Sequence, residues 1–122
     1  MKLDASLFDQ EKVTAWLESL PAETIVGKSQ IACECPLAKY FRSLGIIAEI
    51  GSKGTASLCT VDDQYKLIAQ ERDIIMPEWA RWFVAEVDIL GRFKPCVREN
   101  MLDVIKGIKC EKNKSKKRSE KK

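Results

Sequence analysis

The sequence predicts an α+β domain followed by a basic tail, and three observations support this prediction. Apolar residues recur at helical spacing near both ends of residues 1–108, whereas residues 46–69 form short β-prone runs between turn residues. After Ile108 no apolar periodicity remains. We therefore expect a single α+β domain over 1–108 and a disordered Lys-rich tail over 109–122. The expected order is two N-terminal helices, a three-stranded antiparallel meander and two C-terminal helices.

The first helix is expected over residues 6–20. Ser6 can cap it, with Asp9 three residues later in a loose capping box, and Pro21 ends it. The apolar positions at helical spacing are Val13, Trp16, Leu17 and Leu20.

A connection over residues 21–32 is expected next, with Ile25 and Val26 tucked under the body. The second helix is expected over 36–44. Proline suits its first position, where a missing N–H is harmless, and Gly45 suits the position after its end.

The middle of the chain predicts an antiparallel meander, because Gly-rich and Asp-rich turns separate its β-prone runs. Tyr65, Leu67 and Ala69 are expected on one face of the last strand. The three runs are 46–50, 55–61 and 65–69.

Two helices are expected after the meander. The first runs from Pro77 to Leu90, and Gly91 ends it; the second runs from Pro95 or Val97 to Lys106. The apolar stripe of the first comprises Trp79, Trp82, Phe83, Val84, Val87 and Leu90. We expect this stripe to be core, with one Trp at the rim beside Arg81, where a partner could dock.

Cys33 and Cys35 precede the helix-opening proline and are the first candidates for chemistry. A redox pair normally has two intervening residues, and structural zinc normally takes four N or S ligands. The chain has five cysteines and no histidine, so zinc would need the scattered Cys59, Cys96 and Cys110 as well. We favour packing, with Cys33 as a small apolar group and Cys35 at the cap position; zinc and a working thiol remain the alternatives.

No catalytic constellation is recognisable, and we expect no enzyme and no cofactor. The commonest general base near neutral pH is missing, because histidine is absent. Asp62 and Asp63 are adjacent carboxylates in a predicted turn. Gly27-Lys28-Ser29 imitates the end of a phosphate-binding loop, but Ala22 stands where the motif needs its first glycine.

The charge is concentrated at the C-terminus. In 109–122, eight Lys/Arg oppose two acids and give +6, while 1–108 has 13 basic and 16 acidic residues and carries −3. Such a tail binds phosphate backbones through counterion release and without base-specific contacts, or else it is a solubilising terminus. The candidate tail contacts are Lys112, Lys114, Lys116, Lys117, Arg118, Lys121 and Lys122. Candidate contacts on the body are Lys39, Arg42, Lys53 and Arg81.

The block CPLAKYF, followed by strands and a Trp-rich helix, resembles small prokaryotic or phage proteins of no named family. That resemblance favours a microbial or mobile-element origin and implies no mechanism.

The sequence thus favours a small non-enzymatic accessory protein that docks on a protein or nucleoprotein complex and touches DNA or RNA through its tail. The first alternative is direct nucleic-acid binding by helix 36–44 and the β-hairpin, and the second is a thiol- or zinc-dependent protein. No apolar run approaches the roughly 20 residues of a membrane span, and the N-terminus lacks a secretory apolar segment, so a cytoplasmic location is expected.

Overall fold

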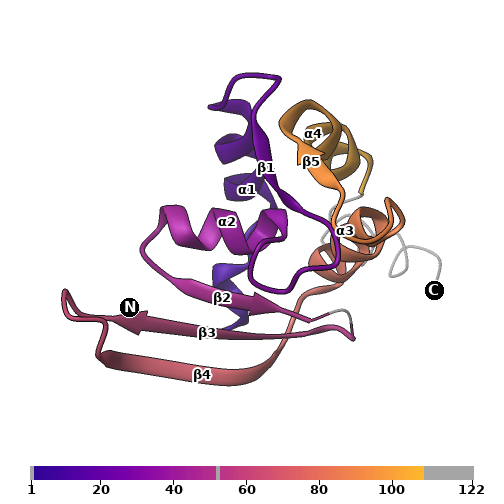
Figure 1. The fold of residues 1–122 in the computed structure, drawn as a ribbon. Coiled ribbons are helices and arrows are strands. Elements are labelled where there is room, and N and C mark those ends of the chain that lie inside the picture. Colours follow the sequence, from indigo (N-terminus) through magenta and orange to yellow (C-terminus); the bar gives the residue numbers. More distant parts are fainter. Residues whose placement is uncertain (1, 52, 109–122) are drawn as a thin grey trace, which may run out of the picture.

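The structure, a computed structural model, describes residues 2–51 and 53–108, where helices lie before and after a run of three consecutive strands. The class is α+β, as expected (Figure 1). A short 3-10 helix, η1 (Ala5–Leu7), comes first. The helices are α1 (Gln10–Glu18), α2 (Pro36–Ser43), α3 (Glu78–Asp88) and α4 (Arg98–Gly107). The strands are β1 (Ile25–Lys28), β2 (Ile47–Ile50), β3 (Thr55–Val61), β4 (Leu67–Ile75) and β5 (Pro95–Val97).

The predicted antiparallel meander is confirmed as a sheet in the order β2-β3-β4. Strand β4 extends six residues beyond the expected end at Ala69 and stops at Ile75. The pairing of β3 with β4 shifts twice, so that two bulges interrupt it. Bulges increase the local twist of a strand and re-aim its side chains. The sequence thus predicted the meander correctly but underestimated the length of its last strand.

Strands β1 and β5 are a correction, because the sequence predicted a connection and the start of a helix there. They pair antiparallel, with Ile25 opposite Val97 and Lys28 opposite Pro95. The last helix consequently begins at Arg98, with Val97 as its cap residue, and not at Pro95. Strands of three and four residues are too short to show an alternating pattern.

The first helix begins later than predicted. Ser6 lies in η1, where its backbone N–H donates to the Asp4 carboxylate at 2.9 Å. Asp9 is the cap of α1 and accepts a hydrogen bond from the Lys12 N–H at 3.1 Å. Between the two helices the chain turns and buries Phe8. The Phe8 ring packs edge-on against the Phe41 ring, with 4.9 Å between the ring centroids. This turn separates η1 from α1.

Helix α2 lies at the centre of the core. Leu37 and Phe41 are fully buried on it, and α2 packs against β2 (Figure 1). The predicted helix end is confirmed, because Gly45 follows with a φ of +81°, a conformation that glycine adopts without strain.

The two ends of the described chain are joined by hydrogen bonds. The Gln10 side-chain amide donates to the carbonyls of Ile105 and Ile108, at 3.2 and 2.9 Å. The Arg98 guanidinium donates to the Leu17 carbonyl at 2.7 Å, and the Trp79 indole donates to the Phe8 carbonyl at 3.1 Å. Helices α1 and α4 are therefore packed side by side.

None of the helices in residues 2–51 and 53–108 has both the length and the apolar character of a membrane span.

Candidate functional site

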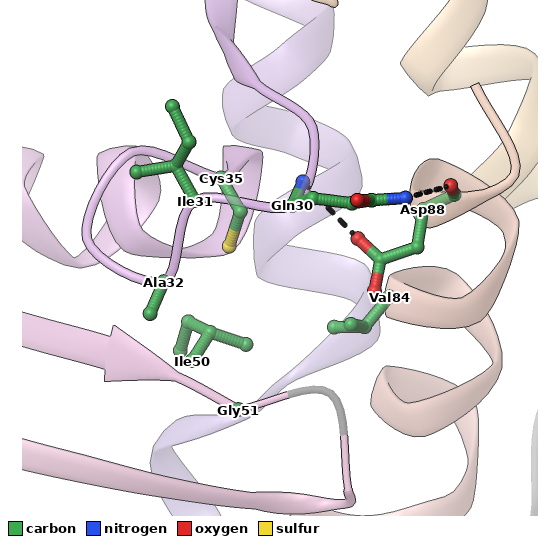
Figure 2. A pocket seen from close by; sticks show the side chains of 8 residues that line it. All are labelled: Gln30, Ile31, Ala32, Cys35, Ile50, Gly51, Val84 and Asp88. Carbon is green, nitrogen blue, oxygen red and sulfur yellow. Dashed lines mark hydrogen bonds between the residues drawn. The ribbon is translucent and has the colours of Figure 1, made fainter. Parts of the chain in front are cut away.

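A cavity of about 570 Å³ lies beside Cys35 and is the first candidate site (Figure 2). Its walls come from the loop after β1, the end of β2 and helix α3. Figure 2 shows the Cys35 sulfur pointing toward Ile50, with Val84 and Asp88 across the space. Cys35 is the cap residue of α2, as predicted, but its side chain makes no cap hydrogen bond.

Burial keeps the Cys35 thiol protonated. The side chain is 6% exposed, and desolvation raises its pKa to about 12, although the backbone N–H groups of Ala38 and Leu37 act in the opposite direction. Desolvation, together with the nearby Asp88 carboxylate, likewise raises the pKa of Cys96 to about 11. A thiol is a nucleophile and a metal ligand in its deprotonated form, so both groups are unreactive near neutral pH.

The polar groups of this cavity hold the loop in place. The Gln30 backbone N–H donates to the Asp88 carboxylate at 3.3 Å, and its side-chain amide donates to the Asp88 carbonyl at 2.9 Å (Figure 2). Gln30 has a φ of 58°, so these contacts stabilise an uncommon backbone conformation. The polar residues that line the cavity therefore have a structural role.

Cys33 is exposed, so the prediction that it packs as a small apolar group was wrong. It lies in the turn before α2, where the helix start buries Cys35 instead. Cys59 lies on β3 and Cys96 on β5, and no three Cys, Asp or Glu side chains among the described residues are grouped for a metal ion. Cys110 lies outside the described residues.

The Gly27-Lys28-Ser29 segment has a structural explanation. Gly27 and Lys28 belong to β1, and a Cβ at Gly27 would collide with the carbonyl oxygen of Glu34. The buried Ser29 hydroxyl donates to the Gly91 carbonyl and accepts the Lys94 N–H at 3.0 Å. These hydrogen bonds join the loop after β1 to the loop between α3 and β5.

The four candidate basic residues of the body fall into two pairs. Lys39 and Arg42 lie on α2. Lys53 lies in the turn between β2 and β3. The next residue, Gly54, lies close to Arg81 on α3, since a Cβ added at Gly54 would be 3.0 Å from the Arg81 Cδ. The seven candidate tail residues lie outside the described part of the chain.

Trp82 is the expected rim tryptophan. It is 52% exposed and lies beside Arg81, while Trp79 is buried. Leu90, predicted on the same apolar stripe, lies beyond the end of α3 and is exposed, because the helix stops at Asp88.

Strand β4 carries a surface that residue patterns did not indicate. It lies at the end of the sheet, with β3 and β2 between it and helix α2 (Figure 1). Of its nine residues, the structure buries Ile74 alone. We define the β4 surface as Tyr65 of the preceding turn together with the exposed side chains Leu67, Ile68, Gln70, Glu71, Arg72, Asp73 and Ile75.

Large apolar side chains are prominent on the β4 surface. Ile68 is 66% exposed and Ile75 is 69% exposed. Tyr65, at 83% exposed with a φ of 62°, lies in the turn and not on the strand face where we predicted it. Leu67 pairs with Val61 and Ala69 pairs with Thr60, so the bulge between them puts Leu67 and Ala69 on opposite faces, contrary to prediction.

A hollow of about 430 Å³ lies where the three strands of the meander meet. It is lined by Ile47 and Glu49 from β2, Ser57 and Cys59 from β3, and Gln70 and Arg72 from β4, among others. Apolar side chains and charged groups of both signs thus line this hollow.

No protein-family model matches this chain, and neither a curated protein nor a solved structure is significantly similar to it.

Proposed function

We propose that the protein is a small non-enzymatic accessory protein that docks on a protein or nucleoprotein complex through the β4 surface. Its basic tail has a separate role, which is non-specific contact with DNA or RNA. The observation that carries it is a nine-residue edge strand with large apolar side chains in solvent. Exposed edges of this kind template pairing with other chains, and exposed apolar patches are typical of interaction sites.

The charge of the hairpin favours a protein partner over nucleic acid at this surface. Residues 55–75 contain four acids and two bases and carry a formal charge of −2. Phosphate backbones require the opposite sign. The negative charge of the hairpin weighs against the alternative in which helix 36–44 and the hairpin bind nucleic acid directly. Contact with nucleic acid is assigned instead to the tail over 109–122, whose formal charge is +6.

The burial of Cys35 weighs against a thiol- or zinc-dependent function. Desolvation raises the pKa of this thiol to about 12, while Cys33 is exposed to solvent, so the two groups do not share one environment. A metal-binding pair needs two thiolates directed at one point.

Photo-crosslinking tests the docking proposal. A photoreactive residue at Ile68 on the β4 surface, introduced into the full chain in its native host, is expected to give discrete protein adducts. The same residue at Glu99, which is exposed on α4, is the matched control and is expected to give few. Equal labelling from both positions would contradict the proposal.

The same two positions in a chain of residues 1–108 separate the roles of body and tail. The Ile68 adducts are expected to persist without the tail, because the docking surface lies within the body. Binding to DNA or RNA, measured by anisotropy, is expected to be lost together with its salt dependence, which falls by roughly 0.7–0.9 in log K per log salt for each phosphate contact removed. Nucleic-acid binding that survives truncation would assign the contact to the body.

A further inference from the structure

We infer that the β4 edge accepts an extended segment of a partner protein as a fourth strand, and that this segment carries Lys or Arg at its centre between apolar residues. The inference rests on the proposed function and names the mode of docking and the chemistry of the partner. Strand addition gains affinity from main-chain hydrogen bonds and specificity from alternate side chains.

Within residues 2–51 and 53–108, β4 is one of the two edge strands of the sheet, and β2 is the other. Strand β4 pairs with β3 on its inner side, from Leu67 to Ile75. The backbone groups on the other side of a strand alternate with those used in the pairing. Strand β4 therefore offers outward donors and acceptors, which are regular over its centre at Ala69–Glu71 and are interrupted by the bulges at Ile68 and at Arg72–Asp73, where Asp73 has a φ of 55°.

The two faces of β4 differ in chemistry. Leu67 is opposite Val61 and Ile75 is opposite Thr55, so both lie on the face of the sheet away from the core. Glu71 is opposite the buried Leu58 and lies on the other face, where it remains exposed. An added strand therefore meets Leu67, Gln70 and Ile75 on one face and the Glu71 carboxylate at the centre of the other.

The surrounding charges favour a basic segment. Asp62 and Asp63 lie in the exposed turn before β4, Asp73 lies two residues after Glu71, and Lys66 and Arg72 only partly offset them. Opposite charges on neighbouring strands stabilise the pairing, and like charges destabilise it. A central Lys or Arg opposite Glu71 satisfies this requirement.

A second copy of this chain is a poor occupant of the same edge. A two-fold axis through an antiparallel strand pair places one residue opposite its own copy. Pairing all nine residues of β4 puts Glu71 opposite Glu71, and centring the pair on Arg72 puts Arg72 opposite Arg72 and Glu71 opposite Asp73. Both registers oppose like charges, a device that edge strands use against self-association.

The test uses the full chain and a nine-residue peptide of alternating valine and lysine with blocked ends. Titration followed by amide NMR is expected to shift β4 resonances and to increase their protection from hydrogen exchange. Two further versions carry backbone N-methyl groups, on the valines in one and on the lysines in the other. One version is expected to lose binding and the other to retain it, because one edge of an added strand faces β4.

Charge reversal at the centre of the strand provides the second arm. Glu71→Lys is expected to weaken binding of the lysine peptide by roughly threefold to tenfold and to strengthen binding of a peptide with glutamate in place of lysine. Glu86→Lys, the same change at an exposed position on α3, is the matched control and is expected to stay within about twofold of the unmodified protein.

Strand addition is wrong if both N-methylated peptides bind like the unmodified one, if Glu86→Lys has the effect of Glu71→Lys, or if the lysine peptide leaves the β4 resonances unchanged. Should any of these occur while the Ile68 adducts persist, docking through the β4 surface stands and its mode is different. Loss of the adducts as well would overturn both proposals.

Discussion

The loop around Cys35 and strand β4 are opposite kinds of region. The segment from Gly27 to Cys35 contains two cysteines and a Gly-Lys-Ser sequence and lies beside Asp88, yet the Cys35 thiol is desolvated, and Gln30 and Asp88 hydrogen-bond to each other. Strand β4 contains no chemically reactive motif, yet it exposes an unpaired edge and large apolar side chains. The reactive residue types thus do not coincide here with the groups whose interactions are incomplete.

Close packing explains why the loop is so constrained. The Lys28 N–H donates to the Glu34 carbonyl at 2.8 Å, which draws the loop against β1 at the point where Gly27 has no side chain. Strand β4 has no comparable cover along its outer edge among the described residues. Substitutions in the two regions should therefore differ strongly in their effect on stability.

The largest effect is expected from Gly27→Ala. This glycine has a φ of +147°, and a Cβ would collide with the Glu34 carbonyl oxygen, so the free energy of unfolding should fall by about 3 kcal/mol or more. Gly45→Ala is the matched control, because its φ is +81° and nothing lies within 4 Å of the added Cβ. Its cost is about 1–2 kcal/mol, and equal losses in urea denaturation would refute the packing argument.

A smaller effect is expected at high pH, and it arises from the buried thiols. The pKa of Cys35 is about 12 in the folded protein and near 9.0 in the unfolded chain, so the unfolded state loses its proton first. Between these values stability falls as pH rises, by about 1.4 kcal/mol per pH unit for this group. Urea denaturation at pH 8, 9 and 10 measures the slope.

Cys35→Ala should reduce that slope by the contribution of one thiol, and Cys33→Ala, a change at an exposed cysteine, serves as its control. Cys96, whose pKa is raised to about 11, contributes in the same direction. A slope that Cys35→Ala leaves unchanged would show that this thiol ionises freely, and it would reopen the case for chemistry at the cavity.

The smallest effect is expected in the β3–β4 turn. The Asp62 carboxylate accepts hydrogen bonds from the Gln64 N–H at 2.8 Å and the Lys66 N–H at 2.9 Å, so Asp62→Ala should cost about 1 kcal/mol. Asp63→Ala, at the exposed neighbouring position, should stay within about 0.5 kcal/mol. If both changes were neutral, the hairpin would be held by its pairing with β3 and not by its turn.

Much of the fold was predictable because its elements have strong periodic signals. The buried stripe of α3 and the proline and glycine at the ends of α2 identified those helices, and the turn residues identified the meander. The Asp62 turn was also predicted and is confirmed by its two carboxylate hydrogen bonds.

The errors have physical causes that one sequence does not display. Strands β1 and β5 are each stabilised by a partner far away in the chain. Charges at Glu71, Arg72 and Asp73 concealed the second half of β4, because an edge strand need not bury either face. The β4 surface was missed for the same reason. An alternating apolar pattern indicates a strand with one buried face, and β4 buries Ile74 alone.

The long-range pairing of β1 with β5 has a consequence for the order in which a growing chain acquires its structure. Strands β2, β3 and β4 are consecutive, so they can assemble as soon as residue 75 has been synthesised, whereas β1 must wait for residues 95–97 and Gln10 for α4. The outer edge of β4 is open during that interval, as it is in the folded protein. The charged side chains along this edge disfavour aggregation of the growing chain.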